Sequence, residues 1–127
     1  MLCSNTAAFV DLAFTNNGAL SIVNSTLSFG TTAILNGSVT IDLNNLVPGN
    51  AVLTGANVTI TTNSSLKLLG ATATNMTLIT YSGALSGDFG SRVTGKPSGY
   101  RLVYGTGINS AVSLQPIPTS RSLLLVL

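Results

Sequence analysis

The sequence predicts an all-β protein, a right-handed parallel β-helix (β-solenoid) with a C-terminal antiparallel β cap. Short apolar runs alternate with polar residues at every second position, as in strands with one buried and one solvent-exposed face. The breaks between these runs are two to seven residues long and contain mainly Asn, Gly and other small polar residues. The apolar residues are mostly Leu, Val, Ile and Ala, with 6% aromatic residues and no Trp, and side chains of these sizes can stack in a narrow interior.

The expected strands follow one another closely, and their first group covers 19–23, 26–29, 33–35 and 38–43. After Pro48-Gly49-Asn50 the alternation resumes at 51–54, 57–61, 65–69, 77–81, 100–104 and 111–114. Ile41, Ile60 and Leu78 recur at intervals of 19 and 18 residues, which is close to the length of one solenoid coil. An antiparallel sandwich is the alternative, but it predicts hairpin turns and several large core aromatics.

This pattern divides the chain into four parts. We expect a partial N-terminal coil or frayed edge at 1–18, solenoid coils at 19–80, a C-terminal cap at 81–115 and a tail at 116–127. All three tyrosines and four of the five basic residues follow residue 80. Aromatic and charged side chains in that position would close the stacked interior and prevent end-to-end strand pairing.

The chain also contains a series of short motifs in a characteristic order. They are the strand 38–43, Pro48-Gly49, a strand ending in Thr54-Gly55, two strands within 57–69, the strand 77–81, Leu85-Ser86-Gly87-Asp88-Phe89 and Gly99-Tyr100-Arg101-Leu102-Val103-Tyr104. In this order they resemble the C-terminal end of autotransporter-type β-helical passenger repeats, over roughly two thirds of the chain. The resemblance implies a bacterial protein that is secreted or displayed on the cell surface.

The C-terminal tail carries a second resemblance. Pro116-Ile117-Pro118, followed by the apolar run 123–127, is similar to a truncated bacterial PEP-type C-terminal sorting tail. Ile117 stands where such tails carry an acidic residue, and no basic residue follows the apolar run. A final strand or a frayed terminus is the alternative interpretation.

The polar residues are almost all uncharged. Only 6% of the residues are charged, against about 25% in an average globular domain, whereas Ser, Thr and Asn together supply 44 residues. Arg92, Lys96 and Arg101 fall within ten residues of one another, and we expect solvated loop charges there rather than a site for a phosphate or a lipid surface. Binding to nucleic acid is not expected, because a dense basic face with stacking aromatics is missing.

The residue types that usually carry catalysis are scarce. The chain has no His and a single cysteine, Cys3, so neither a Ser-His-Asp triad nor a common zinc site can be assembled. The side-chain carboxylates are Asp11, Asp42 and Asp88, and Asp42 is expected to face solvent in mid-strand. We therefore predict no catalytic, cofactor-binding or metal-binding residue, and no cofactor.

The sequence thus predicts a non-catalytic structural or adhesive segment that is extracellular or on the outer cell surface, although no signal peptide and no membrane span is visible. Its partners would be glycans, extracellular matrix or other cells, contacted through the lateral face. The alternative is a remnant of a polysaccharide-binding or polysaccharide-degrading β-helix, in which Asp42 or Asp88 contributes to a carbohydrate site. Five Asn-x-Ser/Thr triplets, a weak indication of glycosylation, begin at Asn24, Asn36, Asn57, Asn63 and Asn75. The ligand and the oligomeric state stay open.

Overall fold

The computed structural model describes residues 2–4, 7–10, 13–44, 52–105 and 110–118, and within them it contains strands and no helix. The prediction of an all-β chain is therefore confirmed. Three features named from the sequence lie outside the described residues: the Pro48-Gly49 turn, Asp11 and the apolar run 123–127.

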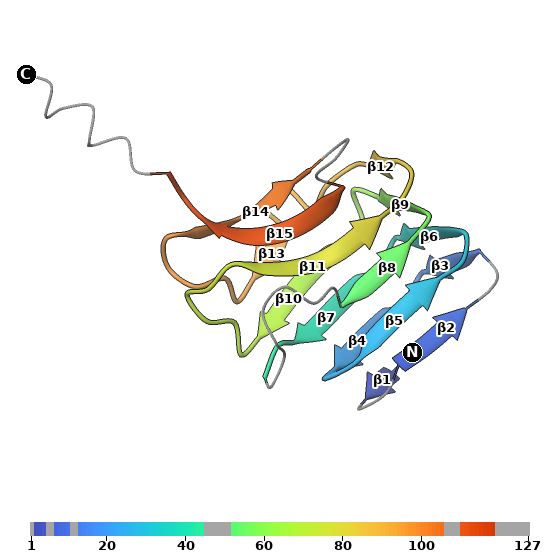
Figure 1. The fold of residues 1–127 in the computed structure, drawn as a ribbon, viewed down its shortest axis with the longest axis horizontal. Helices are drawn as coiled ribbons and strands as arrows, with labels where there is room; N and C mark the ends of the chain where they lie inside the picture. The colour runs from blue at the N-terminus through green and yellow to red at the C-terminus, as the bar shows by residue number, and fades with distance from the viewer. Residues whose placement is uncertain (1, 5–6, 11–12, 45–51, 106–109, 119–127) are drawn as a thin grey trace, which may run out of the picture.

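The strands form three sheets (Figure 1). Sheet A has the order β1-β4-β7-β10-β13 and contains Leu2–Ser4, Ala19–Val23, Ser38–Asp42, Ser65–Leu69 and Val93–Thr94. Sheet B has the order β14-β15-β11-β8-β5-β2 and contains Tyr100–Tyr104, Ala111–Pro116, Met76–Tyr81, Leu53–Gly55, Thr26–Phe29 and Ala7–Val10. Sheet C has the order β12-β9-β6-β3 and contains Leu85–Ser86, Asn57–Ile60, Thr32–Leu35 and Phe14–Asn16.

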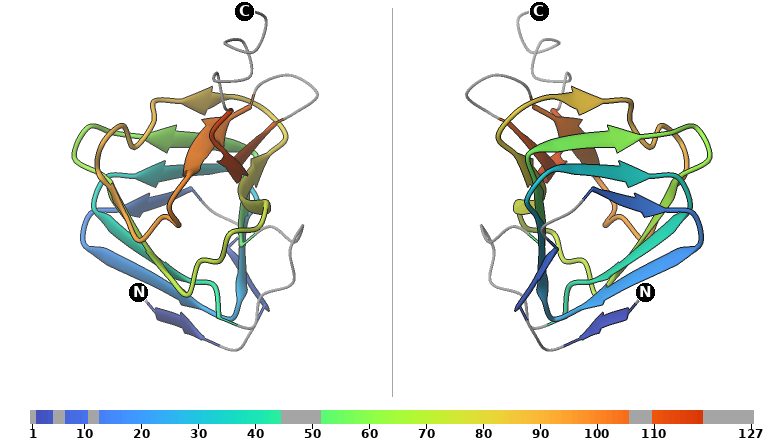
Figure 2. Two further views of the ribbon diagram at one scale, coloured as in Figure 1. Left: turned by 90° about the vertical axis from the view of Figure 1, so that its left-hand side faces the viewer. Right: turned by 90° about the vertical axis from the view of Figure 1, so that its right-hand side faces the viewer.

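Successive strands visit the sheets in the repeating order A, B, C, from β1 to β13. Each strand in this part pairs in parallel with the strand three places later in the chain, and the three sheets lie around a common interior (Figure 2). Among the described strands, hairpin pairing, which the sandwich alternative requires, occurs only between β14 and β15. Parallel sheets are thus confirmed, as expected for strands that are joined by crossovers rather than tight turns.

The register shows that the coil length is not constant. Ala19 pairs with Ser38, 19 residues later, and the Asn17 and Asn36 side chains that bond to each other have the same separation. Further along, Thr54 and Thr80 are hydrogen-bonded at a separation of 26 residues. The longer coils contain extra residues between strands, for example at 61–64 and 70–75.

The predicted period is therefore wrong in one respect: Ile41, Ile60 and Leu78 are not equivalent positions of successive coils. These three side chains lie in β7, β9 and β11, which belong to sheets A, C and B. Ile41 instead pairs with Ile22 on one side and Leu68 on the other. A spacing near 19 is real in the first coils, but these three residues mark successive sides of the interior rather than equivalent positions.

The interior consists of apolar rows that run from coil to coil. In sheet B, Leu27, Leu53, Ile79 and Val112 follow one another in register, and each is 0% exposed. Fully burying one such side chain stabilises the fold by about 1.5–3 kcal/mol. Burial alternates along nearly every strand, because successive side chains of a strand point to opposite faces. In β4, for example, Leu20 and Ile22 are buried, whereas Ser21 and Val23 point outward.

The C-terminal part combines both kinds of pairing. β12 and β13 still pair in parallel with β9 and β10, so the parallel pattern continues beyond residue 81. β15 then pairs antiparallel with both β11 and β14. A register shift between Thr77 and Ile79 allows the consecutive residues Leu78 and Ile79 both to be buried.

Candidate functional site

The outer face of sheet A presents polar side chains in rows that run across the strands. One row consists of register partners on β4, β7, β10 and β13, which are Ser21, Thr40, Lys67 and Thr94. A second row contains Ser38 and Ser65. Adjacent members of a row are separated by the inter-strand distance, about 4.8 Å. The alternation that buries Val39 and Leu66 therefore places these hydroxyl groups on the solvent side.

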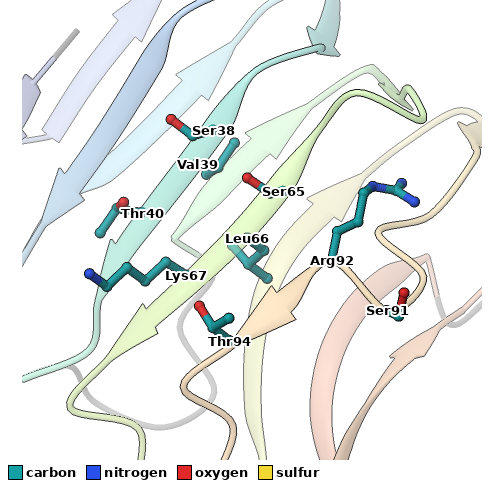
Figure 3. Close-up of a pocket in the computed structure, with 9 residues that line it drawn as sticks. All are labelled: Ser38, Val39, Thr40, Ser65, Leu66, Lys67, Ser91, Arg92 and Thr94. Carbon is teal, nitrogen blue, oxygen red and sulfur yellow. The ribbon is translucent and has the colours of Figure 1, made fainter.

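An open pocket of about 430 Å³ lies on this face, over β7, β10 and β13 (Figure 3). From β7 and β10 it is lined by Ser38, Val39, Thr40, Ser65, Leu66 and Lys67. Ser91, Arg92 and Thr94 complete the lining. The pocket therefore contains hydroxyl groups and two cations, and its lining includes no carboxylate.

The hydroxyl groups of the pocket differ from those on sheet B. On sheet B the Thr54 and Thr80 hydroxyls bond to each other at 3.0 Å. Within the described part of the chain, the structure gives no side-chain hydrogen bond to the hydroxyls of Ser38, Ser65 or Thr94. A free hydroxyl can both donate and accept, so those of sheet A are available to a ligand.

The two cations of the pocket are held differently. The Arg92 guanidinium donates from Nε to the Ser64 carbonyl at 2.6 Å, and from Nη2 to the carbonyls of Asp88 at 2.8 Å and Thr61 at 3.3 Å. Its geometry is thus fixed by neutral acceptors. The Lys67 side chain is exposed, and no hydrogen bond or ion pair holds it within the described residues. In Figure 3 the Lys67 ammonium lies beside Thr40, and the Arg92 guanidinium extends in the opposite direction.

Arg92 belongs to a polar corner that leads from sheet C into sheet A. Asn36 donates from Nδ2 to Asn17 Oδ1 at 2.9 Å, and Thr61 donates from Oγ1 to Asn36 Oδ1 at 2.6 Å. Asn16 Oδ1 accepts from the Gly37 amide, and the Ser64 hydroxyl donates to the Gly37 carbonyl. This ladder links three successive coils and sets where the sheet A strands begin.

The sequence contains a signal for this corner that the alternation of apolar and polar residues does not reveal. Asn17-Gly18, Asn36-Gly37 and Asn63-Ser64 all stand immediately before a sheet A strand. Ser38 and Ser65 donate their amides to the carbonyls of Gly18 and Gly37. A Cβ on Gly37 would lie 2.2 Å from the Gly18 carbonyl oxygen, so this close approach requires glycine.

The candidate carboxylates are not brought into the pocket. Asp42 lies at the end of β7, where its Oδ1 accepts hydrogen bonds from the Asn44 amide and the Asn44 side chain. Asp88 lies in the turn after β12 and is exposed. Among the described residues, no three His, Cys, Asp or Glu side chains are grouped in a way that could hold a metal ion.

The three basic residues that stand close in the sequence are separated in the fold. Arg92 lines the pocket, Lys96 is exposed beyond β13, and Arg101 is exposed on β14 of sheet B, where it pairs with Gln115.

Cys3 lies on β1 and pairs with Ile22. The five Asn-x-Ser/Thr triplets are also scattered, and Asn36 uses its amide nitrogen in the corner ladder.

Comparison with known proteins does not place the chain in a family. No protein-family model matches it, and searches of curated proteins and of solved structures found no match. Within the described residues there is no helix of the length and apolarity that a membrane span requires.

Proposed function

We propose that the chain is a non-catalytic structural or adhesive segment of a secreted or cell-surface bacterial protein, of the kind found in autotransporter-type passengers. Its fold would be a right-handed parallel β-helix whose interior is closed by the antiparallel strands β14 and β15. The cyclic order of strands supports this fold, and parallel crossovers are right-handed with very few exceptions.

The outer face of sheet A is the observation that carries the functional proposal. It offers rows of hydroxyl groups at regular spacing and an open pocket rather than a deep cavity with convergent reactive groups. Such a surface makes many weak polar contacts. Glycans, extracellular matrix and other cells present the complementary hydroxyl and amide groups. The absence of Asp42 and Asp88 from the pocket lining makes this proposal preferable to a polysaccharide-degrading remnant.

A binding assay on immobilised glycans, matrix proteins and whole cells tests the proposal, with two matched variants. Thr40→Tyr places a large side chain in the sheet A pocket, and Thr26→Tyr places the same side chain on sheet B. Tyr is well tolerated in strands, so both variants should fold. We expect Thr40→Tyr to weaken adhesion and Thr26→Tyr to leave it unchanged.

Two results would contradict the proposal. One is an equal loss of adhesion in both variants, which would remove sheet A as the contact surface. The other is a wild-type chain that retains no glycan, matrix protein or cell above background.

A further inference from the structure

The sheet A pocket contains an exposed cation, Lys67, that no hydrogen bond or ion pair holds within the described residues. Arg92 also lines the pocket, and neither Asp42, which bonds to Asn44, nor Asp88 is part of the lining. The three acceptors of the Arg92 guanidinium are backbone carbonyls, which carry no net charge. The Lys67 ammonium therefore remains available to a ligand, whereas Arg92 adds positive charge from a position fixed by its hydrogen bonds.

From this charge and the free hydroxyls we infer that the pocket binds an acidic polysaccharide, whose carboxylate pairs with the Lys67 ammonium. This inference rests on the proposed adhesive function and names its ligand class. The sugar hydroxyls would contact the rows that contain Ser38, Ser65 and Thr94. An ammonium group forms a charge-assisted hydrogen bond with a carboxylate, and a hydroxyl matches a sugar hydroxyl as both donor and acceptor.

The shape of the surface favours a chain molecule over a small ligand. The rows cross three neighbouring strands at a spacing of about 4.8 Å, so successive groups of an extended ligand meet equivalent protein groups. None of the lining residues is aromatic, and this argues against single-stranded nucleic acid, which binds by base stacking. The two apolar lining residues, Val39 and Leu66, are buried, so the pocket offers no exposed apolar anchor of the kind by which amphipathic surfaces enter a lipid interface.

Titration of the folded chain with polygalacturonate, and in parallel with the neutral polysaccharide dextran, tests the inference. We expect binding to polygalacturonate that weakens as salt rises, and clearly weaker binding to dextran. Lys67→Gln should lower the affinity for polygalacturonate about fivefold, which corresponds to the loss of one exposed ion pair. Lys96→Gln removes the same charge outside the pocket and should change the affinity less than twofold.

A second pair of variants tests the position of the ligand. Ser38→Asp introduces a carboxylate at an exposed lining position and should abolish most of the binding. Thr15→Asp introduces the same charge at an exposed position of sheet C and should have little effect on the affinity.

The possible failures are distinct. Equal losses in Lys67→Gln and Lys96→Gln would overturn the inference in favour of diffuse charge attraction. Equal binding of dextran and polygalacturonate would overturn the acidic ligand class but leave the adhesive surface intact. Failure to bind either polysaccharide, while the chain still adheres to cells or matrix through sheet A, would overturn the inference alone. Binding to phosphatidylserine vesicles that depends on Lys67, without polygalacturonate binding, would replace the glycan by a lipid surface.

Discussion

The two ends of the stack finish in different ways. At the N-terminal end β1, β2 and β3 each form the edge of a sheet. Phe14 on β3 is only partly buried, stacked on Phe29 with ring centroids 4.7 Å apart, and Leu2 is 68% exposed. Both ends of the stack have edge strands, β12, β13 and β14 at the other end, but among the described residues the N-terminal end has the less completely covered apolar side chains.

At the C-terminal end, aromatic side chains and one arginine cover the interior in the place of a further coil. Phe89 is completely buried, and its amide donates to the Tyr104 hydroxyl at 3.1 Å. The buried Tyr81 donates its hydroxyl to the Gly105 carbonyl. Arg92 donates to the backbone carbonyls of Thr61, Ser64 and Asp88. At this end, aromatic rings thus cover the core, and an arginine side chain ties together backbone carbonyls near the end of the stack.

The largest effect is expected from Phe89→Ala. This substitution removes a fully buried ring from the C-terminal end and should lower the free energy of unfolding by about 3–5 kcal/mol. Chemical denaturation followed by circular dichroism measures the change. A loss below about 1 kcal/mol would mean that Phe89 does not close the core.

Arg92→Met should lower the free energy of unfolding by about 2 kcal/mol. Met keeps much of the aliphatic stem but removes the donors to three backbone carbonyls, and hydrogen bonds to charged groups are among the stronger ones. The control is Arg101→Met, at an exposed position of β14, which should change stability by less than about 0.5 kcal/mol. Similar effects of the two variants would show that Arg92 is not an end-closing residue.

Phe14→Ala tests how much the partly buried ring at the N-terminal end contributes to stability. The ring is partly exposed and packs mainly on Phe29, so its truncation should cost about 1–2 kcal/mol, less than the truncation of Phe89. The same denaturation experiment measures both variants. If Phe14→Ala is the more damaging, then the N-terminal end is the better-packed one and the comparison fails.

The smallest effect is a dependence on alkaline pH. Burial raises the pKa of Tyr81 and of Tyr104 above the ordinary value of 10.0, and for Tyr104 nearby Asp88 acts in the same direction, whereas the Phe89 amide and Arg92 oppose it. Since the unfolded state loses these protons first, their stabilising contribution is complete below about pH 10 and disappears as the pH rises through the folded pKa. Thermal unfolding between neutral and strongly alkaline pH should show this decline. The double variant Tyr81→Phe with Tyr104→Phe should reduce it, and an unchanged slope would contradict the assignment.

The alternation of apolar and polar residues was sufficient to locate most of the strands. Four predicted strands have the bounds that the structure shows, namely 19–23, 26–29, 65–69 and 100–104. Other predicted strands differ from the observed ones by one or two residues at their ends, the strands within 1–18 were not predicted individually, and the shortest strands were missed because their pattern is too short to detect. β12 and β13 are two residues each and exist because a neighbouring strand pairs with them, which no local period can show.

An all-β chain that is poor in charge and has one apolar face for each strand follows directly from the order of the amino acids, because these properties depend on neighbouring residues. Which strands lie side by side, and which side chains share a surface, follows from the folded arrangement. Coils of 19 residues are followed by coils with separations of 25 to 27, and insertions between strands change the spacing without disturbing the pairing. Thr40, Lys67 and Thr94 consequently meet on one face although unequal stretches of chain separate them, and the register of backbone hydrogen bonds brings them together.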